Sequence, residues 1–534
     1  MSFVLNSNSQ LNFNDSVLNL TEREKRFLEK SWAKPFTEKI FPNIDEEPFS
    51  VLYSGKASRP NTPVNVIVGA MILKEMLGDT DDELVEALMF DVRYQYALHT
   101  TSYEEQPLSD RTLSRFRERC ITYETETGID LIKECITGLS SQMAEIMGLR
   151  KGLKRMDSMM ISSNIKKLSR LELLYTCVAN LVKLMQKKED IIPEGLKHYC
   201  EADDQNKVIY HMRSEDIDNR TKTVLEDASI LLYKCKGKYD ESSEYQLLIR
   251  VINEQTTEDT DGNLQLKPKD DKTLDSSILQ NPSDPDATFR FKSGKEHRGY
   301  VANLVETVDE NGSIITGYSY EQNIHSDSAF LKESIESLAG TEECETTVVT
   351  DGAYGGMENI ELAKDNHINL VTTNMQGRKA ADIYADFIFS EDGKKVLKCA
   401  GGQTPVTNKY YPKTEQCRIT LDKNKCNQCP HKDQCKPKFY KKKTALVISW
   451  KLAERAKQQR YMKSEEFKEH ARFRNGVESL PSIIKRRYHA DRMPVRGKLK
   501  TKLFFGFKIA AINFQKLFNF LNSSDSCTQI PELC

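Results

Sequence analysis

Three acidic residues are suited, by type and by setting, to hold divalent metal ions. Asp157 lies in the short apolar segment KRMDSMMISS, and Asp351 follows the β-branched run TTVVT and precedes a glycine. Glu478 lies in a late stretch with helical patterning. Carboxylate oxygens are ligands that Mg²⁺ prefers, and two such ions roughly 3.5–4 Å apart can drive an in-line phosphodiester displacement. Taken singly, each acid is more often a turn, cap or solvated residue. Whether the three form a metal site therefore depends on the elements that position them.

A cluster of cysteines forms a second candidate metal site. Cys417, Cys426, Cys429 and Cys435 are separated by eight, two and five residues. The Cys-x2-Cys pair is a good half-site for tetrahedral zinc, whereas the other spacings are irregular. The pattern therefore leaves two interpretations, a structural Zn²⁺ or four free thiols in a loop. The lysines around the cluster either contact nucleic-acid phosphates or form a solvated face.

The hydrophobic pattern predicts the elements that would position these residues. Helices are expected over 64–77, after Thr80 with Glu83 completing a capping box, from Ser109, and over 129–148, 326–338, 452–490 and 500–520. Strands are expected over 154–163, 298–308, 313–320, 346–350 and 368–373. The order strand, hairpin, helix, strand, strand, helix implies a mixed α/β sheet. Residues 254–286 predict a mobile polar loop, and residues 375–450 an irregular segment.

The helix expected from Ser109 is unusually basic. It carries Arg111, Arg115, Arg117 and Arg119, and it is the third of three short helices in residues 62–120. Such a unit is typical of a helix-turn-helix DNA reader, in which one helix enters the major groove. The alternative is a helical bundle with a solvated basic face. The pattern alone favours neither.

The net charge of −2 over 534 residues hides a strong local asymmetry. Residues 484–508 hold nine Lys or Arg against one acid, and residues 254–286 hold nine acids against three lysines. The basic segment suits phosphate contacts, while its phenylalanines at helical spacing predict core residues. No stretch reaches the ~18–20 apolar residues of a membrane span, and the polar N-terminus predicts no secretory signal. We expect an intracellular protein with reduced thiols.

Several segments resemble bacterial insertion-sequence transposases of the DDE type, in the same order along the chain. They are RPNTPVNVIVGAMILKEMLGDTDDELVEALMFDVRYQYAL, LSDRTLSRFRERC, MDSMMISSNI, DPDATFRFKSGKEHRGYVANLVE, VVTDGAYGG and RNGVESLPSIIKRRYHADRMPVRGKLKTKLFFGFKIAAINFQKL. The resemblance is to the IS1182-type family, related to the IS4 and IS5 transposases, and covers most of residues 45–520 apart from 170–280. Related transposases carry a Tyr-x2-Arg-x3-Glu-x6-Lys signature. Arg474, Glu478 and Lys485 fit its spacing, whereas Ala471 stands in the tyrosine position.

The resemblance implies an RNase-H-like catalytic domain joined to an all-helical N-terminal DNA-binding domain. Residues 1–150 would form the latter, with its helix-turn-helix-like core at 62–120. Residues 151–164, 286–374 and 452–520 would form the catalytic domain, with Asp157 on its first strand and Asp351 on its fourth. Residues 165–285 would be a helical insert with an acidic loop, and 375–451 a Cys-rich insert carrying the zinc knuckle.

The same resemblance implies roles for the site residues. Asp157, Asp351 and Glu478 would hold two Mg²⁺ or Mn²⁺ ions. The residues that would contact DNA are Arg474, Lys485, Arg111, Arg115, Arg486 and Arg487. Joining two DNA ends requires at least two protomers, so a homodimer is expected in the DNA complex, in the bacterial cytoplasm at the nucleoid and without membrane contact.

Three functions remain open on the sequence. The first is an active transposase that binds the terminal inverted repeats of its own mobile element, cleaves the DNA and joins the 3′-hydroxyl to a target. The second is a catalytically retired transposase that acts only as a DNA-binding protein, although the intact acids argue against such decay. The third is a metal-dependent nuclease without joining activity.

Overall fold

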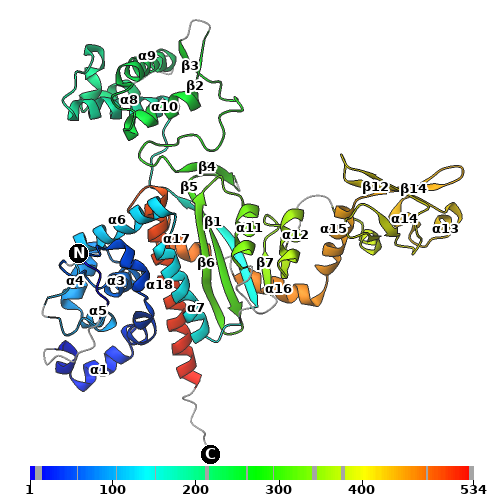
Figure 1. The fold of residues 1–534 in the computed structure, drawn as a ribbon, viewed down its shortest axis with the longest axis horizontal. Coiled ribbons are helices and arrows are strands. Elements are labelled where there is room, and N and C mark those ends of the chain that lie inside the picture. The colour runs from blue at the N-terminus through cyan, green and yellow to red at the C-terminus, as the bar shows by residue number, and fades with distance from the viewer. Residues whose placement is uncertain are drawn as a thin grey trace, which may run out of the picture.

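The computed structural model arranges the chain around one central sheet (Figure 1). It describes residues 1–6, 15–56, 58–103, 105–150, 152–210, 216–259, 263–292, 294–338, 346–373, 379–476 and 479–527. N-terminal helices and α18 lie on one side of the sheet, and α11 and α12 lie on the other side. A helical unit projects at one end and a small β-rich unit at the other.

The central sheet is mixed, as the sequence predicts. Its strands are β1 (Leu153–Ser162), β4 (Thr288–Lys292), β5 (Lys295–Asp309), β6 (Gly312–Gln322), β7 (Thr346–Thr350) and β8 (Ile368–Thr372). They follow the order β4-β5-β1-β7-β8, and β6 also pairs with β5. β1 is antiparallel to β5 and parallel to β7, which is parallel to β8. Both faces of β5 are buried from Gly299 to Leu304, in the middle of the sheet.

Helices of the N-terminal part pack on one another and on the C-terminal helix. They are α1 (Glu22–Glu29), α2 (Ala33–Pro35), α3 (Val64–Leu77), α4 (Asp81–Phe90), α5 (Val92–Ala97), α6 (Asp110–Thr127) and α7 (Leu131–Ile146), with the shorter helical turns η1 (Ser16–Asn19), η2 (Phe36–Ile40), η3 (Phe41–Asn43) and η4 (Glu47–Leu52) between them. The expected capping box is present at α4, where Thr80 and Glu83 satisfy each other's backbone N–H groups.

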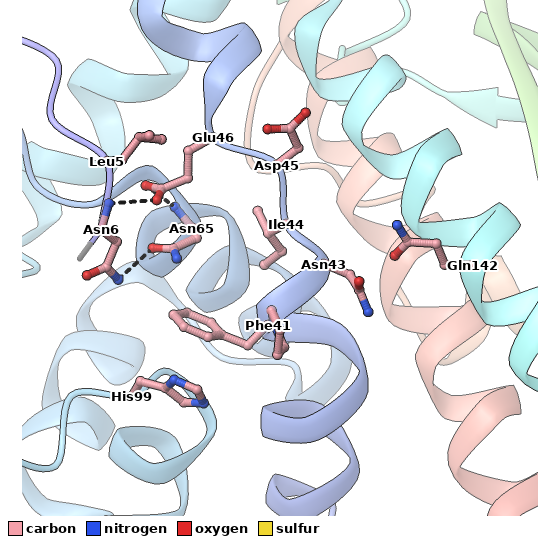
Figure 2. Close-up of a pocket in the computed structure, with 11 residues that line it drawn as sticks. Leu5, Asn6, Phe41, Asn43, Ile44, Asp45, Glu46, Asn65, His99 and Gln142 are labelled. Carbon is pink, nitrogen blue, oxygen red and sulfur yellow. Dashed lines mark hydrogen bonds between the residues drawn. The ribbon is translucent and has the colours of Figure 1, made fainter. Parts of the chain in front are cut away.

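Helix α3 begins with help from a distant acid. Its N-cap position is Pro63, whose side chain offers no acceptor. Glu46 takes that role, because its Oε2 accepts from the N–H groups of Val64 at 2.7 Å and Asn65 at 3.1 Å (Figure 2). Its other oxygen accepts from the N–H of Asn6 at 2.9 Å. One buried carboxylate therefore fixes both the start of α3 and the N-terminal segment.

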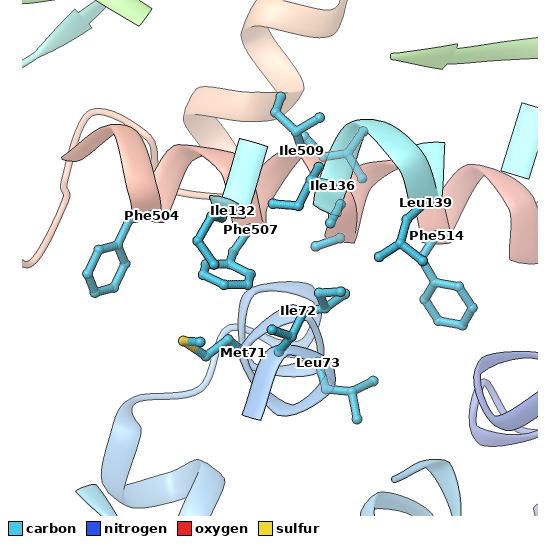
Figure 3. Close-up of a cluster of buried hydrophobic side chains, with 14 of the residues drawn as sticks. Met71, Ile72, Leu73, Ile132, Ile136, Leu139, Phe504, Phe507, Ile509 and Phe514 are labelled. Atoms are coloured by element: carbon cyan, nitrogen blue, oxygen red, sulfur yellow. The ribbon is translucent and has the colours of Figure 1, made fainter. Parts of the chain in front are cut away.

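The long helix α18 (Lys498–Cys527) joins the N-terminal helices to the sheet. Phe504, Phe507 and Phe514 pack among residues of α3 and α7 (Figure 3). From the same helix, Phe505 contacts Tyr318 and Tyr320 of β6. The predicted core role of these phenylalanines is confirmed, since Phe504, Phe505 and Phe507 are all buried.

The stretch 165–285 has a hydrophobic core of its own. It contains α8 (Arg170–Lys187), η5 (Glu194–Cys200), η6 (Asn206–Tyr210), α9 (Ile217–Cys235), α10 (Ser243–Gln255), β2 (Thr256–Glu258) and β3 (Leu264–Leu266). The acidic part is more ordered than the sequence predicts. Arg250 explains much of this, because its guanidinium donates to the carbonyls of Ser277 and Pro285 at 2.9 and 2.8 Å.

The region expected to be irregular contains a four-stranded sheet, β11-β12-β14-β13. Its elements are η8 (Asp382–Asp386), β9 (Ile388–Phe389), β10 (Val396–Lys398), β11 (Thr407–Tyr411), β12 (Gln416–Leu421), α13 (Lys423–Asn427), α14 (Lys432–Cys435), β13 (Lys438–Phe439) and β14 (Thr444–Ile448). The signal for β12 was the alternation in QCRITL, whose second, fourth and sixth side chains are buried.

The single long helix expected over 452–490 is divided into α15 (Trp450–Tyr461), α16 (Glu465–Asn475) and α17 (Ser479–Arg486). Ser464 caps the N-terminus of α16 through a bond from the N–H of Phe467, which starts a new helix after a short turn. Helices α11 (Asp327–Leu338) and α12 (Met357–Asp365) cover the opposite face of the sheet. Among the helices of the described residues, none has the length and apolar character that crossing a bilayer requires.

Candidate active site

Asp157 and Asp351 are brought side by side by the pairing of two parallel strands. Arg155 of β1 is in register with Val349 of β7. Continued by two residues, this register sets Asp157 opposite Asp351, on neighbouring strands that run about 4.7–4.9 Å apart. Residues in register on parallel strands point to the same face of a sheet. The register thus favours one face for both carboxylates, and the negative charge of Asp351 helps to raise the pKa of Asp157.

The pKa of Asp157 is raised, and burial of the carboxyl group is the main cause. Arg474, the backbone N–H of Ser158 and Lys292 act in the opposite direction, while the nearby carboxylate of Asp351 adds to the rise. Asp157 is thus an acid whose negative charge the protein only partly compensates. A bound cation would supply the missing compensation.

Helix α16 ends beside this pair of acids. The Nη2 atom of Arg474 lies 3.5 Å from Oδ1 of Asp157, and Arg155 donates from Nη1 to the carbonyl of Phe473 at 2.5 Å. Both contacts hold the last turn of α16 against β1. Glu478, the third expected acid, lies outside the described residues, three positions after the end of this helix.

A buried ion network supports β1 behind the acids. Nε of Arg155 lies 2.7 Å from Oε2 of Glu306, and Lys516 of α18 pairs with the other oxygen of Glu306. Ser313 donates to Glu306 at 3.0 Å. Lys516 and Arg155 together hold the pKa of Glu306 below its usual range in spite of burial. The strand that carries Asp157 is therefore fixed to β5, α16 and α18 at once.

Sequence reasoning missed one acid near the site, Asp327, at the start of α11. Its Oδ1 accepts from the hydroxyl of Ser158 at 2.8 Å, and its Oδ2 lies 3.9 Å from both Arg290 and Lys292. No local pattern marked it, because a lone Asp at the start of a helix usually serves as a cap. Only the fold places it beside β1.

Two family models match the chain. One, described as Transposase DDE domain, matches residues 398–518, and the other, described as Transposase domain (DUF772), matches residues 24–119. Both matched stretches are transposase domains, and they indicate that the protein is a transposase. Such domains are typical of the IS4 and IS1182 types, which confirms the family that the sequence segments resemble. No curated protein and no solved structure matches the chain.

The arginines of α6 in the transposase divide into two groups. Arg117 pairs with Asp81, and Arg119 lies over the ring of Tyr53, with 5.0 Å between guanidinium carbon and ring centroid. Arg111 and Arg115, one helical turn apart, are exposed. The two arginines of α6 that were expected to contact DNA are thus the two that are exposed to solvent.

Four of the nine cations in the basic segment 484–508 form ion pairs within the transposase. They pair as follows: Lys498 with Glu321, Lys502 with Glu124 and Asp130, Lys508 with Glu75, and Lys485 with Asp491 of the same segment. Arg486 and Arg487 are exposed, and Arg487 also donates to Gln515 at 2.9 Å. Part of the charge that the sequence assigned to phosphate contacts therefore stabilises the fold.

The structure separates Cys417 from the other cysteines of the expected zinc set. Its Sγ donates to the carbonyl of Lys394 at 3.2 Å, and Cys417 is not among the residues that line the cavity of the loop cysteines. Cys426, Cys429 and Cys435 instead line one small cavity together with Cys399. Burial raises the pKa of Cys435 to about 11, and the three neighbouring thiols add to the rise. Within the described ranges, no three His, Cys, Asp or Glu side chains are already gathered as a metal-binding group.

Proposed function

We propose that this transposase binds the terminal inverted repeats of its insertion sequence, cleaves the DNA at their ends and joins the freed 3′-hydroxyl to target DNA. Asp157, Asp351 and Glu478 are its catalytic acids. The observation that carries the proposal is the parallel register of β1 and β7, because its last pair, Arg155 and Val349, comes two residues before both aspartates. The matched DDE domain includes residue 478.

The strand order supports an RNase-H-like catalytic domain. When the short strand β4 is left aside, the order is β6-β5-β1-β7-β8, with Asp157 on the first strand and Asp351 directly after the fourth along the chain. This is the placement that the resemblance to DDE transposases implies. We assign residues 151–164, 286–374 and 452–520 to this domain, residues 1–150 to DNA binding, and 165–285 and 375–451 to inserts.

The acids suit Mg²⁺ or Mn²⁺. Asp157 is a carboxylate with a raised pKa in a half-buried position, next to a second carboxylate, and such oxygen-only donors fit hard divalent cations. Two ions held by Asp157, Asp351 and Glu478 would activate the attacking oxygen and stabilise the leaving oxygen. The guanidinium of Arg474 lies beside the carboxylate of Asp157, so it would orient that carboxylate and bind the phosphate oxygens of DNA next to it.

DNA contacts are assigned to cations at two places. Arg111 and Arg115 of α6 would contact the inverted repeat, while Lys485 and Arg486 of α17, with Arg487 directly after it, would hold the DNA near the acids. Two ends must be held together for joining, so we expect a homodimer in the DNA complex. Because the substrate is DNA, we expect the protein to act at the nucleoid, in the bacterial cytoplasm.

The decisive experiment is a strand-transfer assay with purified protein, Mg²⁺ or Mn²⁺, and DNA that flanks the gene. Asp351→Asn is compared with Asp365→Asn, a matched change of an exposed acid at the end of α12. We expect joined products with wild type and with Asp365→Asn. Asp351→Asn should bind the ends and yield no product.

Two other outcomes would replace the proposal. Cleavage without joined product would identify a metal-dependent nuclease. Specific end binding by wild type with no cleavage in either metal would identify a retired transposase that acts only as a DNA-binding protein.

A further inference from the structure

Four cysteines from three short segments surround one cavity in the β-rich unit. They are Cys399, Cys426, Cys429 and Cys435, and the cavity holds about 20 Å³, roughly the space that one small particle such as a water molecule needs. The rest of the lining includes the apolar side chains of Phe387, Leu421 and Leu446, together with Gln403 and Lys432. A cavity of this size with four thiols on its wall suits a single ion rather than an organic ligand.

The first segment is a tight turn that begins at Cys399. The N–H of Gly402 donates to the carbonyl of Cys399 at 2.8 Å, and the N–H of Cys399 donates to the carbonyl of Gln403 at 2.9 Å. Gly402 has a φ of +76°, a conformation that favours glycine. The turn thus returns on itself directly after the cysteine and presents its side chain at the cavity.

Gly401 shows how closely the second segment approaches this turn. A Cβ atom added there would lie 3.0 Å from Sγ of Cys429 and 3.9 Å from Sγ of Cys399. Both thiols therefore lie close to one backbone position, where a larger residue would crowd the thiol of Cys429. Gln403 adds a further contact, with its Nε2 atom 3.9 Å from Sγ of Cys426.

The remaining thiols come from α13 and α14. The N–H of Cys429 donates to the carbonyl of Cys426 at 3.3 Å, and Asp422 caps α13 so that Cys426 enters its last turn. The N–H of Cys435 donates to the carbonyl of His431 at 2.9 Å, and Lys436 then takes a left-handed conformation that ends α14. Each cysteine is thus placed by a turn or a helix end rather than by an extended strand.

We propose that Cys399, Cys426, Cys429 and Cys435 bind one Zn²⁺ ion as a closed tetrahedral site. Thiolates are the ligands that zinc takes in structural sites, at Zn–S distances of about 2.3 Å. Binding deprotonates the thiols and draws them from the cavity wall onto the ion. Cys417 is not a ligand, because its side chain is directed to the carbonyl of Lys394 instead.

The size of the unit explains why it needs an ion. Its core contains few large side chains, of which Phe387, Ile419 and Ile448 are fully buried. Units of this scale, below roughly 70–80 residues, rarely reach stability from apolar burial alone and use metals or disulfides as staples. The ion would join the Cys399 turn to α13 and α14. Without it, the turn contacts α13 through the long bond from Gln403 to Cys426. The inference goes beyond strand transfer and does not depend on it.

The test measures metal content in the full-length protein, purified without added metal and passed through a desalting column. Wild type should retain about one Zn²⁺ per chain, by elemental analysis. Cys399→Ser should lose it, whereas Cys417→Ser, the same change at a buried cysteine of the same unit, should retain it. Substitution by Co²⁺ should give wild type the visible absorption of a tetrahedral thiolate site.

The outcomes separate cleanly. Zinc in wild type and Cys417→Ser, together with its loss from Cys399→Ser, supports the site. Wild type without zinc and without the Co²⁺ bands overturns it. Retention in Cys399→Ser, or loss from Cys417→Ser, also overturns the ligand set. The Co²⁺ spectrum is read on wild type alone, so misfolding of a variant does not decide the question.

Discussion

Two acids on the same face of the central sheet are treated in opposite ways. Glu306 of β5 is fully buried, yet Arg155 and Lys516 hold its pKa below the usual range. Asp157 lies two residues after Arg155 on β1. Burial raises its pKa, and the guanidinium of Arg474, 3.5 Å away, offsets this rise only in part. The first acid is part of a structural ion pair, and the charge of the second is compensated only in part. An incompletely compensated, half-buried acid is a functional candidate.

Loss of the negative charge of Asp157 should have the largest effect on function. Asp157→Asn keeps the shape of the side chain and removes the proposed metal ligand, so strand cleavage should fall by at least about 1,000-fold. Its melting temperature should not fall, because the replaced charge is one that burial disfavours. A gel assay of cleavage and a thermal melt of the same preparation measure both. A clear loss of stability would show that Asp157 is structural, like Glu306.

The compensated acid should give the converse result. Glu306→Gln leaves Arg155 and Lys516 without their partner, and breaking a buried pair in this way costs about 3–5 kcal/mol. Denaturant unfolding should show this loss. Glu310→Gln, at an exposed position of the next turn, is the control and should stay within about 0.5 kcal/mol. Equal stability of the two variants would contradict the assigned network.

The same contrast between free and paired charges extends to DNA binding. Arg111→Ala should weaken binding to the inverted repeat and lower the salt dependence of log K by about one unit of slope. Lys508→Ala removes a buried partner of Glu75, so it should lower stability and leave the salt slope unchanged. Titrations at several salt concentrations decide this. An unchanged slope in Arg111→Ala would remove α6 from the DNA interface.

The smallest expected effect is on the pH dependence of stability. The pKa of Glu306 is lowered in the folded protein, so its contribution is present above the ordinary value of 4.5 and is lost as the pH falls through the lowered pKa. The pKa of Asp157 is raised, so this acid favours folding more at low pH and less as the pH rises. The stability of Asp157→Asn should therefore exceed that of wild type most at neutral pH. A gap that widens towards acid pH would reverse the assignment.

Much of this arrangement could be predicted from local patterns. Residues 64–77 were predicted as a helix and form α3, because apolar spacing and a terminal glycine fix both ends. The strands that carry or precede Asp157 and Asp351 were predicted for the same kind of reason. The capping box at Thr80 and Glu83 is another local signal that the structure contains.

Long-range partners could not be predicted in this way. In the sequence, Lys502 and Lys508 belong to a basic segment. Only the packing of α18 shows that acids of the N-terminal helices pair with them. Cys399 stands 27 positions before Cys426, so spacing alone favoured Cys417 in its place. Asp327 reaches β1 through the fold as well. In each case the deciding contact joins residues far apart in the chain.

The position of α18 also sets the order of events during synthesis. Its phenylalanines complete a core whose other members lie in α3 and α7, more than 350 residues earlier in the chain. While ribosomes still synthesise the central sheet, the apolar faces of these early helices lack their final partner. The nascent N-terminal part is then a substrate for chaperones, which bind exposed apolar surface. A chain interrupted before α18 should be aggregation-prone and short-lived, so fragments would not compete with complete molecules for DNA ends.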